Sequence, residues 1–342
     1  MLRVGILGMG MMGWFHATRY AQLPNVKLVA IADSTSERLE AKEAVAGNMA
    51  NAAGATDLAA LARYTDAGAL IADAQVDIID VCLPTFLHAR YAVQALQAGR
   101  HVLCEKPMAL TLDEADQMIA AARQANRFLM TAQCLRFWPE YLFLRRAVRE
   151  GTFGKLLSLN MFRMGGRPIW SWQNWFIDPA RSGGTIWDLH IHDVDYINYL
   201  LGQPDHVQAS ARKSEATGSY DIIHAIYTYQ GGPQVHMHAG WSMAQIPFNH
   251  GFDAWFERGF LRFDGKNDPP LLLFDDLVQA NGHAPEYEKG DAYANEIAYF
   301  ARCVEQGQPP RECPPESARD SLALVKQEIA VVEGVQALKG KG

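Results

Sequence analysis

The sequence predicts an α/β protein, with a doubly wound parallel sheet in its N-terminal part and an α+β domain with an open, largely antiparallel sheet after it. Two observations carry this prediction. Apolar strands alternate with helical segments through about residue 125, which is the pattern of βαβ units. Beyond about residue 150, short alternating strands follow one another with tight turns, a pattern typical of antiparallel pairing.

Size and charge narrow the class of protein. The chain has 342 residues, 49% of them hydrophobic and 20% charged, which is enough to build two domains. We expect these domains to span residues 1–125 and 126–342, with a C-terminal helix over 316–339 docking on the core. The formal net charge of -7 argues against nucleic-acid and anionic-membrane partners, because binding a phosphate-covered surface of that kind requires clustered Lys and Arg.

The N-terminus and the cysteines predict a cytoplasmic protein. The apolar run over residues 2–7 meets a glycine at once and is too short for a signal-peptide core or a membrane span. The chain has five cysteines without C-x-x-C spacing, so we expect free thiols in a reducing compartment.

A glycine-rich turn follows the first predicted strand, residues 2–7, and precedes a helix to about Gln22. In a G-x-G-x-x-G turn, the first glycine permits the tight bend, the second lets the backbone approach a pyrophosphate, and the third lets helix and strand pack closely. The turn therefore predicts a dinucleotide site that includes Gly8, Gly10, Met11, Met12 and Gly13.

The second strand, residues 26–32, ends at Asp33, at the spacing where a carboxylate accepts the ribose hydroxyls of a dinucleotide. A carboxylate there repels a 2′-phosphate, so the predicted cofactor is NAD, with NADP less favoured. Arg38 follows on the next helix, where we expect it to lie on a solvated face.

The strand-helix alternation then continues. A strand over 76–83 ends at Pro84, and a helix over 88–98 ends at Gly99, where a C-terminal cap is expected. After the next strand, Thr111 and Glu114 form a capping box that begins a helix to about Asn126.

The strand that starts at His101 ends in Glu105, Lys106 and Pro107. Pro107 removes a backbone donor and holds Lys106 in an extended conformation. Ligands of parallel sheets bind beyond the carboxyl ends of the strands, so Lys106 is predicted to face a binding crevice. The alternative is a surface lysine paired with Glu105.

The C-terminal part predicts a helix ending near Glu150 and then several strands, with Gly231-Gly232-Pro233 as a hairpin turn. The strands are expected over 155–163, 207–213, 221–229, 234–241, 252–256 and 260–263. One face of such a sheet must be covered by its own helices or by a second subunit.

A helical run over residues 187–202 interrupts these strands. On an α-helix Asp188, His192 and Asp195 fall on one face. An acid one turn from a histidine can orient it as a general base. The alternative is that Asp188 caps the helix and satisfies His192.

A metal site is a further alternative, but none is predicted. Asp188, His190, His192 and Asp193 contain an H-x-H step, and such a step converges on a metal only in a strand, whereas this segment is predicted to be helical. His236 and His238 share one face of a strand and are expected to line the sheet.

Taken together and in this order, these motifs resemble the Gfo/Idh/MocA oxidoreductases. The resemblance rests on the glycine turn, the Pro84 to His88 turn, Glu105-Lys106-Pro107, Gly183-Gly184 and the Asp188 to Asp195 segment. It implies a Rossmann domain over residues 1–125 and a substrate-binding and oligomerisation domain over residues 126–342. A homodimer or homotetramer is implied as well.

The resemblance also implies the chemistry, which is hydride transfer from a secondary carbinol of a sugar, sugar derivative or cyclitol. Lys106 would polarise the reacting oxygen, His192 would be the general base and Asp188 would orient the pair. Further implied contacts to the cofactor are Pro84, Thr85, His88, Glu105 and Lys106, and those to the substrate are Lys106, Arg163, Trp175, Asp188 and His192.

The chain departs from the family at several positions. The family often has Thr-Pro-Asn before the histidine of the turn, whereas here Pro84-Thr85-Phe86-Leu87 precedes His88. His190 stands where glycine is common in the family, and residues 48–62 read as an insertion. Two alternative functions stay open: a nucleotide-binding sensor without turnover, and a glycoside-processing enzyme that uses NAD transiently.

Overall fold

The computed structural model describes residues 1–41, 58, 60–73, 75–215, 217–275 and 281–334. The chain forms two compact units that are interleaved along the sequence. The first contains Met1–Cys134, Pro168–Ser182 and Asp291–Leu322, and the second contains Leu135–Arg167, Gly183–Gly290 and Ala323–Gly342. Each unit is therefore assembled from three separate stretches of chain, and the two units do not meet at a single boundary in the sequence.

The first unit is built on a parallel sheet of six strands in the order β3-β2-β1-β4-β5-β6. This confirms the doubly wound prediction. The strand order reverses between β1 and β4, which is the switch point where such sheets bind ligands. The strands are β1 (Leu2–Leu7), β2 (Val26–Ala32), β3 (Ala62–Tyr64), β4 (Ile78–Val81), β5 (His101–Glu105) and β6 (Leu129–Ala132).

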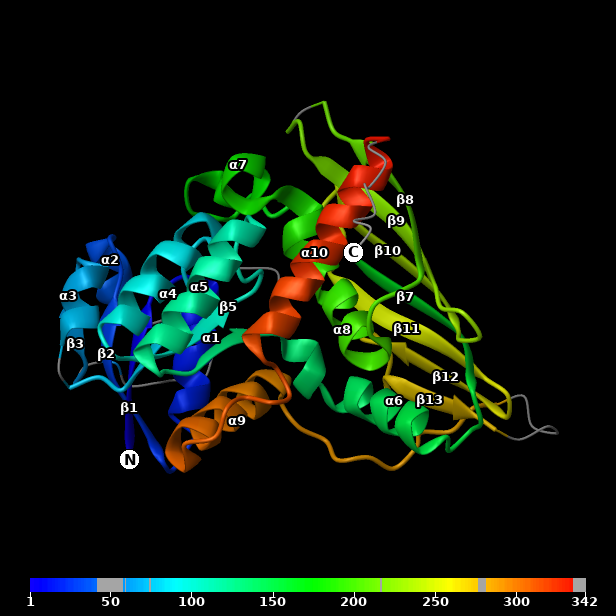
Figure 1. Ribbon diagram of the computed structural model, residues 1–342, viewed down its shortest axis with the longest axis horizontal. Helices are drawn as coiled ribbons and strands as arrows, with labels where there is room; N and C mark the ends of the chain where they lie inside the picture. The colour runs from blue at the N-terminus through cyan, green and yellow to red at the C-terminus, as the bar shows by residue number, and fades with distance from the viewer. Residues whose placement is uncertain (42–57, 59, 74, 216, 276–280, 335–342) are drawn as a thin grey trace. The chain divides into compact units, whose positions relative to one another are not determined.

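Helices pack on this sheet in two groups. Helix α1 (Met11–Tyr20) packs against α9 (Ala292–Gln306), and α4 (His88–Gln97) packs against α3 (Ala67–Ala72) and α5 (Leu112–Ala125) (Figure 1). The Thr111–Glu114 capping box is confirmed at the start of α5. A short helix, α2 (Ser36–Leu39), follows β2. The sequence analysis missed α9.

The second unit contains a sheet of seven strands in the order β13-β12-β11-β7-β10-β9-β8. Only the β7–β10 pair is parallel, so the largely antiparallel prediction is confirmed. The strands are β7 (Leu156–Gly166), β8 (His206–Lys213), β9 (Tyr220–Thr228), β10 (Gln234–Ser242), β11 (Asn249–Phe256), β12 (Gly259–Asp264) and β13 (Leu271–Phe274). The prediction lacked β13.

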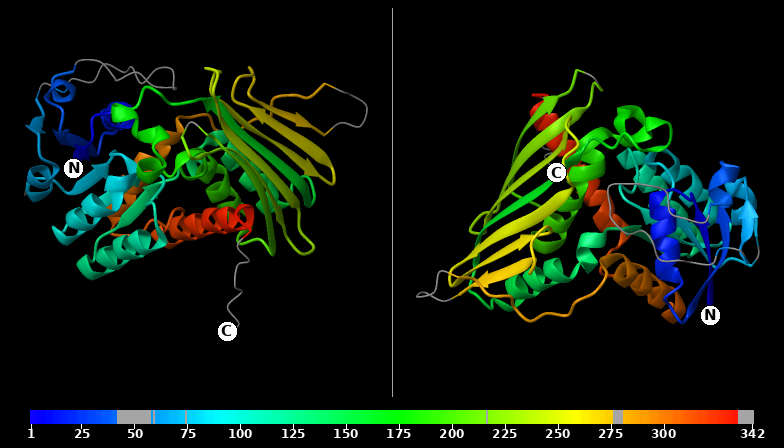
Figure 2. Two further views of the ribbon diagram at one scale, coloured as in Figure 1. Left: turned by 90° about the horizontal axis from the view of Figure 1, so that it is seen from above. Right: turned by 180° about the vertical axis from the view of Figure 1, so that it is seen from behind.

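The seven-stranded sheet has two different faces. Helices α6 (Pro139–Glu150) and α8 (Ile191–Leu201) lie on one face (Figures 1 and 2). Side chains on that face, such as Leu159, Met161 and Val235, are buried. The opposite face carries no helix in the described part of the unit. His236 and His238 lie on it as predicted, and the His238 ring stacks on the His224 ring at 5.7 Å.

The last helix, α10 (Pro315–Val332), ends before the predicted residue 339. Residues 335–339 of that prediction lie outside the described residues, as does most of the proposed insertion over 48–62. Among the described residues, none of the helices combines the length and apolar composition needed to span a membrane.

Candidate functional site

The glycine turn joins β1 to α1 and leaves the start of the helix open. Gly8 adopts a left-handed φ of +93°. A Cβ on Gly13 would collide with the Gly8 carbonyl oxygen, whereas a Cβ on Gly10 would meet nothing within 4 Å. Gly10 is the N-cap of α1 and provides no side-chain cap. The N–H groups at Met11, Met12 and Gly13 are thus presented to an anion, and the turn fits a pyrophosphate.

Asp33 lies at the end of β2 and is tied to this turn. Its carboxylate accepts hydrogen bonds from the Met9 N–H (2.9 Å) and from the Thr35 N–H (2.8 Å). The Arg38 guanidinium lies 3.6 Å from the same carboxylate, and its side chain is half-buried. Arg38 is therefore less exposed than predicted, because α2 turns this side chain back toward Asp33.

His88 connects two turns that follow neighbouring strands. Its ring nitrogens lie 2.8 Å from the Pro107 carbonyl oxygen and 2.7 Å from that of Leu83. Burial lowers the pKa of His88, so the neutral ring can donate to only one of the two carbonyls at a time. Pro84 and the buried Thr85 begin the short 3₁₀ helix Thr85–Leu87 beside it. His88 thus holds in place the segments predicted to contact the cofactor.

Lys106 follows β5, and the Lys106–Pro107 peptide bond is cis. The Lys106 backbone N–H donates to the Glu105 carboxylate at 3.1 Å. The second Glu105 oxygen lies 3.1 Å from His16 Nε2. Glu105 therefore connects the backbone of Lys106 to helix α1.

His16 is the centre of a buried ionic group that sequence reasoning missed. Its Nδ1 lies 2.8 Å from Asp80 Oδ2 on β4. Burial disfavours the imidazolium, but Cys82 and Asp80 outweigh it and raise the pKa of His16. His16, placed between Asp80 and Glu105, links α1, β4 and β5, which carry the glycine turn and Lys106. The sequence did contain a signal for this group. His16 lies within the largely apolar helix after the glycine turn, and Asp80 lies within the apolar strand predicted over 76–83.

The same residues have donors that suit a metal. Cys82 Sγ lies 3.6 Å from His16 Nδ1 and 3.4 Å from Asp80 Oδ1. A metal would require a thiolate and a neutral imidazole. Burial and Asp80 instead raise the pKa of the Cys82 thiol, and the pKa of His16 is raised too. Without a metal, His16, Asp80 and Cys82 form a buried hydrogen-bonded network.

In the second unit, Asp188 and His192 lie in one helical segment that is not a regular α-helix. Ile186–His190 forms a π-helical turn, in which the Ile191 N–H donates to the Ile186 carbonyl, and α8 starts after it. Asp188 is buried in the turn and His192 is half-buried in the first turn of α8. Because a π turn takes more residues than an α turn, the predicted common face no longer follows from the spacing.

Two glycines allow the chain to enter this turn. Gly183 and Gly184 have left-handed φ angles of +77° and +74°. A Cβ on Gly183 would collide with the Trp187 side chain, and a Cβ on Gly184 would collide with Ser219. The Gly183-Gly184 pair therefore serves close packing at the start of the candidate catalytic segment.

Buried arginines anchor the acidic residues of α8. Arg136 forms two hydrogen bonds of 2.8 and 2.7 Å with Asp195. Arg163 Nη2 lies 2.9 Å from Asp193 Oδ1, and Arg163 is only 3% exposed. Arg163 was predicted to contact the substrate, but this geometry favours an anchoring role for it.

Trp175 belongs to the first unit, in the 3₁₀ segment Trp172–Ile177. Its ring stacks on Phe176 at 3.9 Å. Before it, Gln173 and Asn174 both have left-handed φ angles, a costly conformation for residues other than glycine. The described contacts thus show a tightly folded aromatic segment, and substrate binding by Trp175 stays a prediction.

Comparisons with known proteins identify the family of the chain. Residues 2–133 match the family model "Oxidoreductase family, NAD-binding Rossmann fold", and residues 141–262 match the GFO/IDH/MocA C-terminal domain. The chain is 26% identical to myo-inositol 2-dehydrogenase of Thermotoga maritima over 320 residues, covering 90% of each chain. It is 27% identical to inositol 2-dehydrogenase of Rhizobium meliloti over 355 residues, covering 98% of this chain and 97% of the relative. The crystal structure of a probable dehydrogenase from Thermotoga maritima matches with a TM-score of 0.79, 25% identity and 98% coverage of both chains.

The glycine turn yields a paired prediction. Gly13→Ala should destabilise the protein by about 1–3 kcal/mol, because the added methyl overpacks the turn. Gly10→Ala should keep the thermal unfolding temperature but weaken NAD binding at least ~10-fold, or about 1.4 kcal/mol, because the methyl occupies the approach of the pyrophosphate. Differential scanning fluorimetry and calorimetric titration with NAD measure the two effects. Equal behaviour of both variants in both assays would contradict the assignment.

Proposed function

Because the chain belongs to the GFO/IDH/MocA family of NAD-binding oxidoreductases, we propose that it is an NAD-dependent dehydrogenase of a secondary carbinol in a sugar, sugar derivative or cyclitol. In this proposal residues 1–125 hold the cofactor and supply Lys106 to the substrate, and residues 126–342 supply the other substrate contacts, including Asp188 and His192. The observation that carries it is the presentation of Lys106 after β5, on a backbone held by Glu105, in the same unit as an open, uncapped glycine turn.

The cofactor site in this proposal uses the residues that follow the carboxyl ends of the strands. The first N–H groups of α1 bind the pyrophosphate and Asp33 accepts the ribose hydroxyls. Pro84, Thr85 and the Glu105–Lys106 turn, held by His88, bound the nicotinamide end. NAD supplies the hydride acceptor when it is bound.

The protein's own residues manage charge and protons. His192 takes the proton of the reacting hydroxyl, and Asp188 orients its ring and favours the protonated form that results. Lys106 places an ammonium beside the oxygen and stabilises the negative charge that develops on it. Both contributions are needed because the hydroxyl is a very weak acid at neutral pH.

The substrate class is supported by the relatives' names. Those of Thermotoga maritima and Rhizobium meliloti are inositol 2-dehydrogenases. Another relative, 28% identical over 262 residues, is the D-glucoside 3-dehydrogenase of Escherichia coli. Cyclitols and glycosides share a ring with several secondary carbinols, so we propose such a ring as the substrate.

We also propose that the protein is cytoplasmic and forms a homodimer or homotetramer through the bare face of the seven-stranded sheet. This face carries exposed apolar side chains, including Ile222 (43% exposed) and Trp255 (51% exposed). Exposed apolar groups on an uncovered sheet favour association. The five free cysteines fit a reducing compartment.

The catalytic assignment predicts the behaviour of two variants. Lys106→Ala and His192→Ala should each lower kcat at least ~100-fold, because each removes charge or proton handling in the transition state. NADH absorbance with a panel of inositols, aldoses and simple glycosides measures this, and calorimetry should show that NAD binding persists in His192→Ala. Near-normal turnover in both variants would refute the roles.

NAD binding by wild type without turnover on any substrate would favour a sensor instead, and glycoside cleavage without net NADH would favour transient use of NAD.

Cofactor preference should depend on Asp33. Asp33→Ser should raise the ratio of kcat/KM for NADP to that for NAD at least ~10-fold, because it removes a like charge beside the 2′-phosphate. The hydroxyl can still accept the Met9 N–H. Adding Arg38→Ala should reverse much of the gain, since Arg38 would then no longer attract the phosphate. An unchanged ratio in Asp33→Ser would exclude Asp33 as the discriminator.

The association proposal predicts that a charge on the bare face dissociates the oligomer. Ile222→Asp should lower the mass measured by light scattering to that of the monomer, because burying an unpaired carboxylate in an interface is costly. Ile169→Asp, at a position 58% exposed in the first unit, is the matched control and should not change the mass. A monomeric wild-type protein would refute the proposal.

A further inference from the structure

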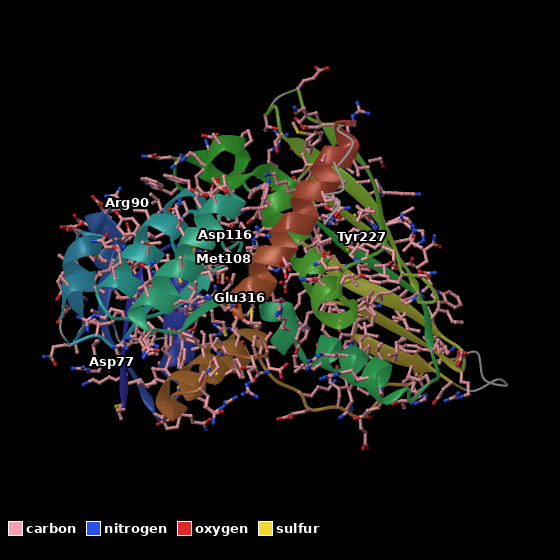
Figure 3. The ribbon with its side chains drawn as sticks, viewed as in Figure 1. Asp77, Arg90, Met108, Asp116, Tyr227 and Glu316 are labelled. Atoms are coloured by element: carbon pink, nitrogen blue, oxygen red, sulfur yellow. The ribbon has the colours of Figure 1, made fainter. Side chains whose placement is uncertain are left out.

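Helix α10 carries a fully buried carboxylate, Glu328, on the part of the helix that belongs to the second unit. Its Oε1 accepts a hydrogen bond of 2.8 Å from the Tyr227 hydroxyl on β9, the strand residue labelled in Figure 3. The same oxygen lies 3.1 Å from His190 Nε2. Glu328 thus joins the last helix to the sheet and to the π-helical turn.

The position of His190 makes this contact relevant to the candidate chemistry. His190 is the last residue of the π-helical turn Ile186–His190, after Asp188 and two residues before His192. The turn packs against β9, β10 and α8. A side chain that fixes His190 therefore also fixes the backbone between the proposed orienting acid and the proposed base.

A protonated His190 ring would pair with Glu328 in this buried group. Facing it are Glu328 from α10, Asp193 from α8, Arg163 from β7 and Tyr227 from β9, while His238 of β10 acts on it electrostatically from the opposite face of the sheet. Asp193 is matched by Arg163, which leaves Glu328 to be matched by His190. Burial disfavours the imidazolium, but Glu328 and Asp193 together outweigh it, so the pKa of His190 is raised.

Burying this group costs free energy of folding. Among the described residues, Glu328 Oε2, His190 Nδ1 and Asp193 Oδ2 are buried without a hydrogen-bond partner. Replacing such a group with well-packed apolar side chains is often neutral or stabilising. A buried ion pair that is only partly satisfied is thus poorly explained by stability alone, and its place beside the π turn suggests another role.

We infer that Glu328 and Tyr227 are positioning residues, which act through His190 to hold the π-helical turn so that Asp188 and His192 keep their catalytic orientation. The inference rests on the proposed function for its catalytic consequence, while the structural link can be measured without any substrate. Misplacing a catalytic group by about 1 Å can cost ~100-fold in rate, so even a small relaxation of the turn should be visible in kcat.

The chain offers a matched control pair, one residue on the same strand and one just after the same helix. Tyr220 on β9 donates to Glu333, just beyond the end of α10, at 3.3 Å, and this pair is exposed. Glu328→Gln and Tyr227→Phe should increase hydrogen-deuterium exchange of the peptide over residues 186–201 and lower kcat roughly 10- to 100-fold. Glu333→Gln should change neither. The Kd for NAD should stay within about twofold in all three variants, because the cofactor residues belong to the first unit.

A double variant separates the contribution of charge from that of hydrogen bonding in the His190–Glu328 pair. His190→Gln/Glu328→Gln replaces the ion pair with an amide pair, and it should restore the protection of the peptide lost in Glu328→Gln. The wild type should lose protection as pH rises through the raised pKa of His190, since the ion pair needs the imidazolium and is complete only at lower pH. The double variant should lack this pH dependence.

The outcomes are distinguishable. Unchanged exchange over residues 186–201 in both Glu328→Gln and Tyr227→Phe would overturn the inference whatever the enzyme assay shows. Loss of NAD binding together with increased hydrogen-deuterium exchange across the whole chain would overturn it as well, because that result indicates general destabilisation. If Glu328→Gln does not fold, the milder variant Tyr227→Phe still tests the inference. An inactive wild type with increased exchange only in the Glu328 and Tyr227 variants would refute the proposed function and support the structural link.

Discussion

Buried carboxylates beside the candidate site are held by buried histidines and arginines, and much of the local architecture follows from these contacts. In the first unit His16 stands between Asp80 and Glu105. In the second, arginines match Asp193 and Asp195 and a histidine matches Glu328. Removing one partner of such a pair leaves an uncompensated buried charge, which typically costs about 3–5 kcal/mol. The same pairs connect elements distant in sequence, so they fix the ends of strands and helices where loops alone would not.

The two units prepare their chemistry in different ways. The first uses backbone: an open helix N-terminus, a carboxylate bound to the turn by the Met9 N–H, and a lysine whose own N–H is held by Glu105. The second uses a helix with altered winding, entered through two glycines in left-handed conformations. Backbone groups suit the recognition of a phosphate, whereas side chains on a rigid helix suit proton transfer, which requires fixed donor and acceptor atoms.

Most of the fold could be predicted because it depends on local patterns. The strand over 26–32, the capping box at Thr111 and the glycine turn are each specified by adjacent residues and were confirmed. The π turn was not predictable, since it needs one residue more than an α turn but leaves the apolar pattern of the segment readable as a regular helix. The pairing of His16 with Asp80 and of Arg38 with Asp33 depends on tertiary proximity that single-sequence spacing does not encode. Helix α9 was overlooked although its Asp291 N-cap is a local signal.

The interleaving of the two units has a consequence for recombination among related genes. The first unit is completed by Pro168–Ser182 and Asp291–Leu322, which lie within and after the segments of the second. A crossover at residue 134 would therefore supply a cofactor-binding part without α9, whose packing on α1 is part of that unit's core. Exchange of cofactor preference between relatives by swapping gene halves is thus disfavoured.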